Sequence, residues 1–217
     1  MKVDIVCISD THGREELVTL PPGDLLLHAG DWGARGNEPH AIGFLQWFES
    51  QPHPNKAFIA GNHSFFSENK KSQFAHLVGE YAPSCHYLCD SGVTLCGLRI
   101  WGSPVQPRFL DWAWNRDRGA AIKAHWDLIP LDTQVLITHG PPHGILDDVR
   151  GERASQGCRD LLDAVKRLPE LRLHVFGHLH LSGGCRVIEG SATFVNAAMV
   201  DEDYELTRQA QVITIET

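Results

Sequence analysis

The chain has 217 residues, of which 42% are hydrophobic and 21% are charged, as in a globular domain with a large core. Its net charge of −8 disfavours contact with a nucleic-acid duplex or an anionic membrane, unless bound cations gather positive charge at one place. Its apolar runs are shorter than the roughly 20 residues of a membrane span. We therefore expect one domain over residues 1–217 and no membrane partner.

The N-terminal run is apolar, but Asp4 interrupts it and no cleavage site of small residues follows, which favours a first strand over a signal peptide. The six cysteines form no C-x-x-C pair and fit free thiols in a reducing compartment. We therefore expect a cytoplasmic protein.

Short β-rich runs that end in turn residues recur along the chain. They predict strands at Lys2–Ile8, Leu25–His28, Lys56–Ala60, Val93–Cys96, Arg99–Trp101, Gln134–Thr138, Leu173–Phe176, Cys185–Ile188, Thr193–Asn196 and Gln211–Ile215. Helices are expected at Glu38–Phe48, Asn69–Val78, Arg118–Leu128 and Gly157–Leu168. Helices and strands alternate early and strands dominate the last third. This order predicts an α/β fold, an αββα sandwich of two mixed β-sheets flanked by helices.

Five of the expected strands end in a carboxylate, an imidazole or an amide. These strand ends carry Asp10 with His12, Asp31, Asn62 with His63, His139, and His178 with His180. Ligands of α/β proteins bind at the carboxyl ends of the strands, so we expect these side chains to converge at one rim. Residues i and i+2 of an extended segment point to the same side, so Asp10 and His12 can reach one ion together.

The donor set indicates metal chemistry. It combines imidazole nitrogen, carboxylate oxygen and amide oxygen without a thiolate, which suits Mn, Fe, Zn or Ni. Apart from His63 the donors number seven, more than one tetrahedral zinc site uses. They suit two ions about 3.5–4 Å apart with a bridging carboxylate, and Asp31 is the natural bridge because it stands alone on its strand end. Two adjacent cations favour the hydrolysis of a phosphate ester.

The ordered motifs D-x-H, G-D, G-N-H, T-H-G and G-H-x-H resemble those of the calcineurin-like metallophosphoesterases. Segments such as "PPGDLLLHAGD", "LITHGPPHGILD" and "LHVFGHLH" resemble the small metallophosphoesterase-domain-containing proteins within that superfamily. The resemblance implies a dinuclear site with manganese or iron as the usual metals. One ion would be held by Asp10, His12, Asp31 and His180, and the other by Asp31, Asn62, His139 and His178. His63 would contact the phosphate beside Asn62 and help to protonate the leaving group.

One residue departs from the family pattern. The family continues Gly-Asn-His with Asp or Glu, an acid that orients the histidine, whereas this chain has Ser64. Either another acid such as Glu68 takes over this role, or His63 is a weaker general acid. Two further features stay open. The segment Arg108–Asn115, with Asn115 at its end, is either a loop packed by tryptophans or a wall beside a ligand, and His143 either touches substrate or is a solvated loop residue.

We therefore expect a dinuclear metal-dependent phosphodiesterase that hydrolyses small phosphate diesters by in-line attack of a metal-bridging hydroxide. The resemblance points to nucleotides or cyclic nucleotides as substrates. The first alternative is a phosphomonoesterase, for example one that acts on phosphoproteins. The second is a weakly active nucleotide-binding regulatory module.

Overall fold

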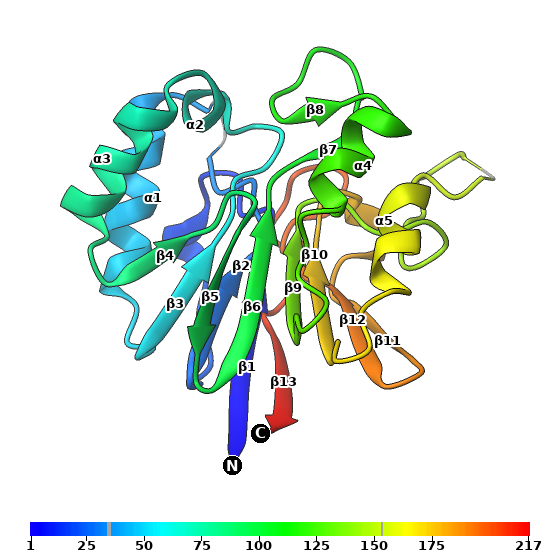
Figure 1. The fold of residues 1–217 in the computed structure, drawn as a ribbon. Helices are drawn as coiled ribbons and strands as arrows, with labels where there is room; N and C mark the ends of the chain where they lie inside the picture. Colours follow the sequence, from blue (N-terminus) through cyan, green and yellow to red (C-terminus); the bar gives the residue numbers. More distant parts are fainter. Residues whose placement is uncertain (34–35, 153) are drawn as a thin grey trace.

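Two mixed β-sheets form the centre of the molecule (Figure 1). The computed structural model describes residues 1–33, 36–152 and 154–217. The five-stranded sheet has the order β13 (Gln211–Glu216), β1 (Lys2–Ile8), β2 (Leu25–His28), β3 (Asn55–Phe58), β4 (Cys85–Tyr87). The six-stranded sheet has the order β11 (Cys185–Glu189), β12 (Ala192–Asn196), β10 (Leu173–Phe176), β9 (Val135–Thr138), β6 (Leu98–Ser103), β5 (Ser91–Leu95). Strands β13, β11 and β5 pair antiparallel at the edges and the other strands pair parallel.

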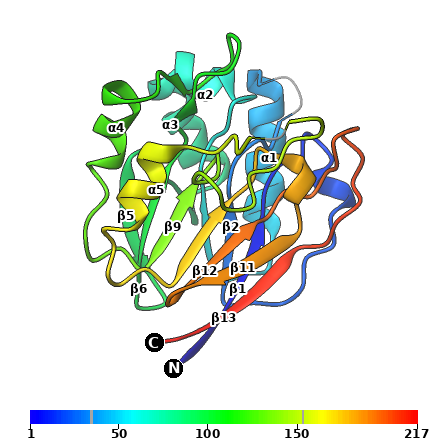
Figure 2. The ribbon, with the colours of Figure 1, turned by 90° about the vertical axis from the view of Figure 1, so that its right-hand side faces the viewer.

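Helices cover the outer face of each sheet (Figures 1 and 2). One side carries α1 (Glu38–Ser50), α2 (Phe65–Asn69) and α3 (Lys71–Tyr81), and the other carries α4 (Ala120–Trp126) and α5 (Arg159–Val165). Short 3-10 helices lie at η1 (Glu15–Leu17) and η2 (His180–Ser182). The predicted αββα sandwich is thus confirmed. No helix in the described part of the chain is long and apolar enough to cross a membrane.

The burial pattern follows the alternation of side chains along each strand. On β1, Ile5 and Cys7 belong to the core between the sheets, whereas Val6 and Ile8 pack toward Phe44 of α1. On the second sheet, Leu136, Phe176 and Phe194 pack with Ile122 and Trp126 of α4 and Leu161 of α5. The central parallel strands β2, β9 and β10 are therefore buried on both faces, as their nearly continuous apolar runs predict.

Local signals explain the boundaries of α1. The Asn37 side chain accepts a hydrogen bond from His40 N at 3.2 Å and Pro39 occupies the first turn, so the helix begins where capping residues favour it. At the other end, the buried Lys56 ammonium donates to the carbonyl oxygens of Glu49 and Gln51 at 3.1 and 3.0 Å. These bonds satisfy carbonyls that the ending helix leaves without partners.

Most predicted elements agree with the structure within a few residues. The helix expected at Asn69–Val78 is wrong at its start, because α2 begins at Phe65 and Lys70 leaves the helical conformation before α3. The sequence reading also missed β4 and the two-residue pair β7 (Gln106–Pro107) and β8 (Asn115–Arg116). These pieces are too short to carry a periodic pattern.

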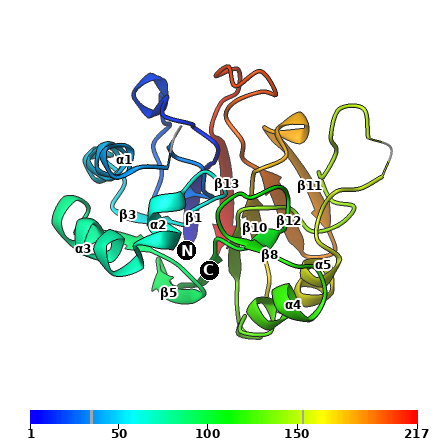
Figure 3. The same ribbon diagram turned by 90° about the horizontal axis from the view of Figure 1, so that it is seen from above.

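The sheets meet at the rim where the parallel strands end. The segments after β1 and β12 touch through a bridge between Ser9 and Ala198. The carboxyl ends of β1, β2 and β3 in one sheet therefore face those of β9 and β10 in the other. Seen from above, this rim lies at the centre of the molecule, between the two groups of helices (Figure 3).

Candidate metal centre

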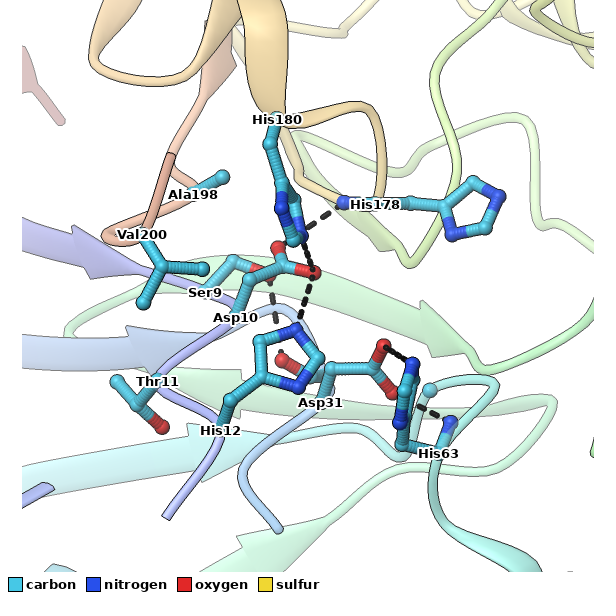
Figure 4. Close-up of polar contacts among 12 residues, drawn as sticks. Ser9, Asp10, Thr11, His12, Asp31, His63, His178, His180, Ala198 and Val200 are labelled. Atoms are coloured by element: carbon cyan, nitrogen blue, oxygen red, sulfur yellow. Dashed lines mark hydrogen bonds and ion pairs between the residues drawn. The ribbon is translucent and has the colours of Figure 1, made fainter. Parts of the chain in front are cut away.

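The structure brings all eight predicted site residues together at this rim. Figure 4 shows six of them, namely Asp10, His12, Asp31, His63, His178 and His180. They follow five strands, with Asp10 and His12 after β1, Asp31 after β2, Asn62 and His63 after β3, His139 after β9, and His178 and His180 after β10. Asp10, Asp31 and His139 are almost completely buried. Asn62, His63, His178 and His180 line a cavity above them.

Four of these residues have a strained backbone. Asp10, His12, Asp31 and His178 have φ angles of 51°, 48°, 55° and 67°, in the left-handed region that residues with a Cβ rarely adopt. Each such conformation costs on the order of 1–3 kcal/mol and persists where the surrounding structure enforces it, typically at functional sites. The chain thus turns sharply at three strand ends to aim these side chains at a common centre.

Two glycines make room for the carboxylates. A Cβ on Gly177 would collide with the carboxylate of Asp10 and the side chain of Ser9. A Cβ on Gly61 would collide with the Asp31 carboxylate and lie 2.7 Å from His139 Cε1. These positions need glycine because the backbone of one strand end lies against the acid of another.

The first group of donors surrounds Asp10. Its Oδ1 lies 3.4 Å from His180 Nε2 and 3.8 Å from His12 Nε2. Asp10 Oδ1 and His12 Nε2 are buried and make no hydrogen bond. The other oxygen, Oδ2, accepts from the backbone N–H of His178 at 3.0 Å, and His180 donates its Nδ1–H to the carbonyl oxygen of Asp201 at 3.0 Å. The His180 contact leaves its Nε2 free to bind an ion.

The second group surrounds His139. Its Nδ1 lies 2.9 Å from the carbonyl oxygen of Ala29, which accepts but cannot donate, so Nδ1 carries a proton. The opposite nitrogen, Nε2, faces Asn62 Oδ1 at 2.7 Å and Asp31 Oδ2 at 3.3 Å. Asn62 Oδ1 also lies 2.8 Å from His178 Nδ1. Acceptor atoms that converge in this way need a proton or a cation between them.

The donor geometry fits metal ions. Two ligands that each lie about 2.1 Å from an ion stand roughly 3.0–3.4 Å apart at angles of 90–110°. Three triads each bring their ligand atoms within 4.8 Å of one another. They are Asp10 with His12 and His180, Asp10 with Asp31 and His139, and His12 with Asp31 and His63. Asp10, His12 and Asp31 each belong to two of these triads, so the triads overlap and form one continuous cluster of donors.

The electrostatics of the site also call for positive charge. Burial raises the pKa of the Asp10 and Asp31 carboxyls, but the neighbouring imidazoles of His180 and His139 outweigh it and hold both pKa values well below their usual range. Burial lowers the pKa of His139, whereas Asp31 and Asp10 raise it, to about 9 overall. Burial lowers the pKa of His12 to about 4, so its ring is neutral and can act as a ligand.

His63 stands apart from the two donor groups. Its backbone N–H donates to Asp31 Oδ1 at 2.8 Å, and its ring packs on Trp112 with centroids 4.2 Å apart. The acid that faces its ring is Asp31, with Nε2 and Oδ2 4.0 Å apart. Ser64 is buried and its Oγ accepts from Gly61 N at 3.2 Å, which closes the Gly-Asn-His turn.

Glu68 does not take the place of the missing acid. Its two carboxylate oxygens accept from the backbone N–H of Trp114 at 2.6 Å and from the Arg116 guanidinium at 3.1 Å. They tie α2 to the segment that carries the aromatic residues. The alternative in which Glu68 orients His63 is therefore wrong.

A cavity of about 640 Å³ opens above the cluster. Its walls include Trp112, which sequence reasoning left open between packing and ligand contact, and Tyr204 and Leu181, which it missed. Tyr204 packs on His12 with ring centroids 4.8 Å apart. No local pattern marks Tyr204, because a loop after the last strand of the second sheet brings it to the rim.

The structure shows the surroundings of the segment Arg108–Asn115 and of His143, whose roles the sequence left open. The Asn115 side chain donates to the carbonyl oxygens of Phe109 and Leu110 at 3.2 and 3.0 Å, so it shapes the loop that it ends. Trp114 is buried packing, with Nε1 donating to Ser67 Oγ at 3.1 Å. His143 lies outside the set of cavity-lining residues.

The motifs behind this site match a family model described as Calcineurin-like phosphoesterase over residues 3–182. The chain belongs to this family. Metallophosphoesterase domain-containing protein 1 of Homo sapiens is 39% identical over 231 residues, which cover 98% of this chain and 71% of that protein. A UPF0046 protein of Caenorhabditis elegans is 35% identical, over 97% of this chain and 74% of that protein.

Solved structures share the fold. One aligns with a TM-score of 0.71 at 13% identity over 98% of this chain and 99% of its own. A crystal structure from Thermus thermophilus aligns with a TM-score of 0.65 at 14% identity, over the same shares of 98% and 99%. At these identities the likeness concerns the fold alone. Family membership, together with the donor groups, indicates a metal-binding hydrolase of phosphoric esters.

Proposed function

We propose that the chain is a dinuclear metal-dependent phosphodiesterase of small phosphate diesters, among which nucleotides and cyclic nucleotides are the first candidates. The observation that carries this proposal is the convergence of donor atoms at the rim, where His139 Nε2 lies 2.7 Å from Asn62 Oδ1 and 3.3 Å from Asp31 Oδ2, and where Asp31 shares one triad with His12 and another with Asp10. One ion would be held by Asp10, His12, Asp31 and His180, and the second by Asp31, Asn62, His139 and His178. When bound, the ions supply Lewis acidity for the phosphoryl group and a means to activate water.

The residues of the chain divide the remaining tasks. His63 stands at the cavity with a partly buried ring, where its imidazole can donate a proton to the leaving oxygen. Its backbone bond to Asp31 and its packing on Trp112 fix the ring between the donor cluster and the cavity. The carbonyl oxygens of Ala29 and Asp201 hold the imidazoles of His139 and His180 in one tautomer and orientation.

A diester assay tests the reaction. Purified protein is stripped with a chelator, reloaded with Mn²⁺, and offered bis(p-nitrophenyl) phosphate beside p-nitrophenyl phosphate. We expect turnover of the diester, lost in Asp31→Asn and retained in Asp163→Asn, a matched control on the exposed surface of α5. Preference for the monoester would indicate the phosphomonoesterase. Nucleotide binding without turnover under any divalent metal would indicate the regulatory module.

A second comparison separates the two roles open to His63, since it also belongs to a triad of possible ligands. If it is the general acid, His63→Ala lowers kcat by about 10²–10⁴ for a diester with an alkyl leaving group. The loss is much smaller with p-nitrophenolate, which leaves without needing a proton. The metal content stays the same. Loss of one bound ion in this variant would instead make His63 a ligand.

A further inference from the structure

The cavity beside the metal-ligand cluster is far larger than a phosphate group needs. Its volume of about 640 Å³ lies within the range of roughly 300–1,000 Å³ typical of sites for whole small molecules. It extends from Asn62 and His63 to the loop that contains Phe109 and Leu110. The rest of the substrate, beyond its phosphate, must therefore be recognised by this outer part.

The outer wall is apolar and exposed. Phe109, Leu110, Leu181 and Tyr204 line the cavity with 61%, 66%, 43% and 44% of their surface exposed. They are four of the ten large hydrophobic side chains that are exposed in the described part of the chain. Large apolar groups gathered at one place on a surface mark a binding site more than scattered ones do.

The loop is held in the conformation that exposes these side chains. Leu110 has a φ of 49°, in the left-handed region that is unfavourable for leucine. The buried Asn115 amide donates to the carbonyl oxygens of Phe109 and Leu110, and its Oδ1 accepts from Phe109 N at 3.3 Å. The hydrogen bonds of Asn115 thus preorganise the wall, which is typical of a ligand-binding site.

The charges around the wall disfavour an additional anion. Both arginines among the described residues that line the cavity are already bonded. Arg108 pairs with Asp117 at 2.6 Å, and Arg118 donates to the carbonyl oxygens of Gly157 and Gln156 at 2.9 and 2.8 Å. Besides Asp31 of the metal-ligand cluster, three acids among the described residues line the cavity, namely Asp148, Glu152 and Glu202, of which Glu202 pairs with the exposed Arg150.

We propose that this wall is a subsite for the organic group of the substrate, and that it selects an uncharged aromatic or apolar group over one that carries further negative charge. The inference rests on the proposed phosphate chemistry and adds its specificity. The apolar side chains gain contact with a neutral ring. A second anion would be repelled by Asp148 and Glu152, and both arginines among the described lining residues are already bonded. Diesters with one phosphate and a neutral base or aryl group fit, and polyphosphates and nucleic acids do not.

Binding of phosphonates, which are not hydrolysed, tests the subsite apart from catalysis. Calorimetry on the Mn²⁺-loaded protein compares methylphosphonate, phenylphosphonate and 4-carboxyphenylphosphonate at one ionic strength. We expect phenylphosphonate to bind roughly tenfold more tightly than methylphosphonate, because its ring leaves water for the apolar wall. We expect 4-carboxyphenylphosphonate to bind more weakly than phenylphosphonate, because the acids of the wall repel its carboxylate. In Glu152→Gln the difference in affinity between these two compounds should become smaller.

Two double variants locate the effect. Phe109→Ser with Leu110→Ser reduces the preference for phenylphosphonate to about threefold or less and leaves the affinity for methylphosphonate unchanged. Leu128→Ser with Leu131→Ser is the control, since these side chains are 54% and 64% exposed but lie outside the cavity. Equal binding of the methyl and phenyl compounds, or a preference that survives the loop variant, overturns the subsite while the phosphate site stands. If none of the phosphonates binds, the proposed function fails with it.

Discussion

The buried His174 gives the folded protein a dependence on pH that can be calculated. Its Nε2–H donates to Thr138 Oγ1 at 2.8 Å, whose own hydroxyl proton goes to the carbonyl oxygen of Gly140 at 2.8 Å. Its other nitrogen, Nδ1, is buried without a hydrogen-bond partner. Burial accordingly lowers the pKa of His174 from 6.5 to about 3.

The sign of the effect follows from proton counting. Below pH 6.5 His174 is protonated in the unfolded chain, whereas in the folded chain it stays neutral until the pH approaches 3. The unfolded state therefore binds more protons, and acid favours unfolding. Between pH 7 and pH 5 the group removes about 1.4 kcal/mol for each unit below 6.5, or about 2 kcal/mol of the free energy of unfolding.

The variant His174→Gln keeps a donor near the position of Nε2 and cannot titrate. Urea unfolding with a chelator present, at pH 7 and pH 5, should show that wild type loses about 2 kcal/mol more than the variant. His76→Gln, on the exposed face of α3, is the matched control and should lose as much as wild type. If wild type and His174→Gln respond equally to pH, the buried neutral state of His174 is refuted.

Three further predictions concern the site. Gly177→Ala should lower Mn²⁺ affinity more than tenfold in calorimetry, because its Cβ collides with Asp10, whereas Gly43→Ala, with open space around it, should not; equal affinities would contradict the packing argument. Mn²⁺ at 100 times its dissociation constant should stabilise the fold by about 2.7 kcal/mol, a rise in Tm of about 5–10 °C that a chelator reverses; an unchanged Tm would count against metal binding. Ser64→Ala should lower the free energy of unfolding in urea by about 1–3 kcal/mol, because Gly61 N loses its buried acceptor. Ser64→Asp keeps an acceptor for Gly61 N and should raise turnover, because a carboxylate stabilises the protonated imidazole of His63. A loss of turnover in Ser64→Asp would show that Asp31 alone is enough to orient His63.

The site could be predicted because its residues stand at strand ends. The run at residues 25–27 is apolar, as a strand buried on both faces requires, and the carboxylate of Asp31, which follows the strand, is then displaced to the rim. Parallel pairing carries such ends to one edge within each sheet, and the packing of the two sheets brings these edges together, so Asp31 and His139 meet although they are 108 residues apart. The assignment of individual ligands and the single domain over residues 1–217 remain predictions.

The fold class and the set of side chains at the rim could be read from the sequence, since both follow from short-range alternation and from the order of motifs. What those side chains touch became known from the folded structure. In the folded structure the Glu68 carboxylate accepts hydrogen bonds from Trp114 and Arg116, and the Ser64 hydroxyl closes a turn. The Tyr204 ring packs over the cluster of metal-binding residues. The physical reason is that a hydrogen bond depends on ångström-scale placement of segments that are distant in the chain, and local pattern carries no record of it.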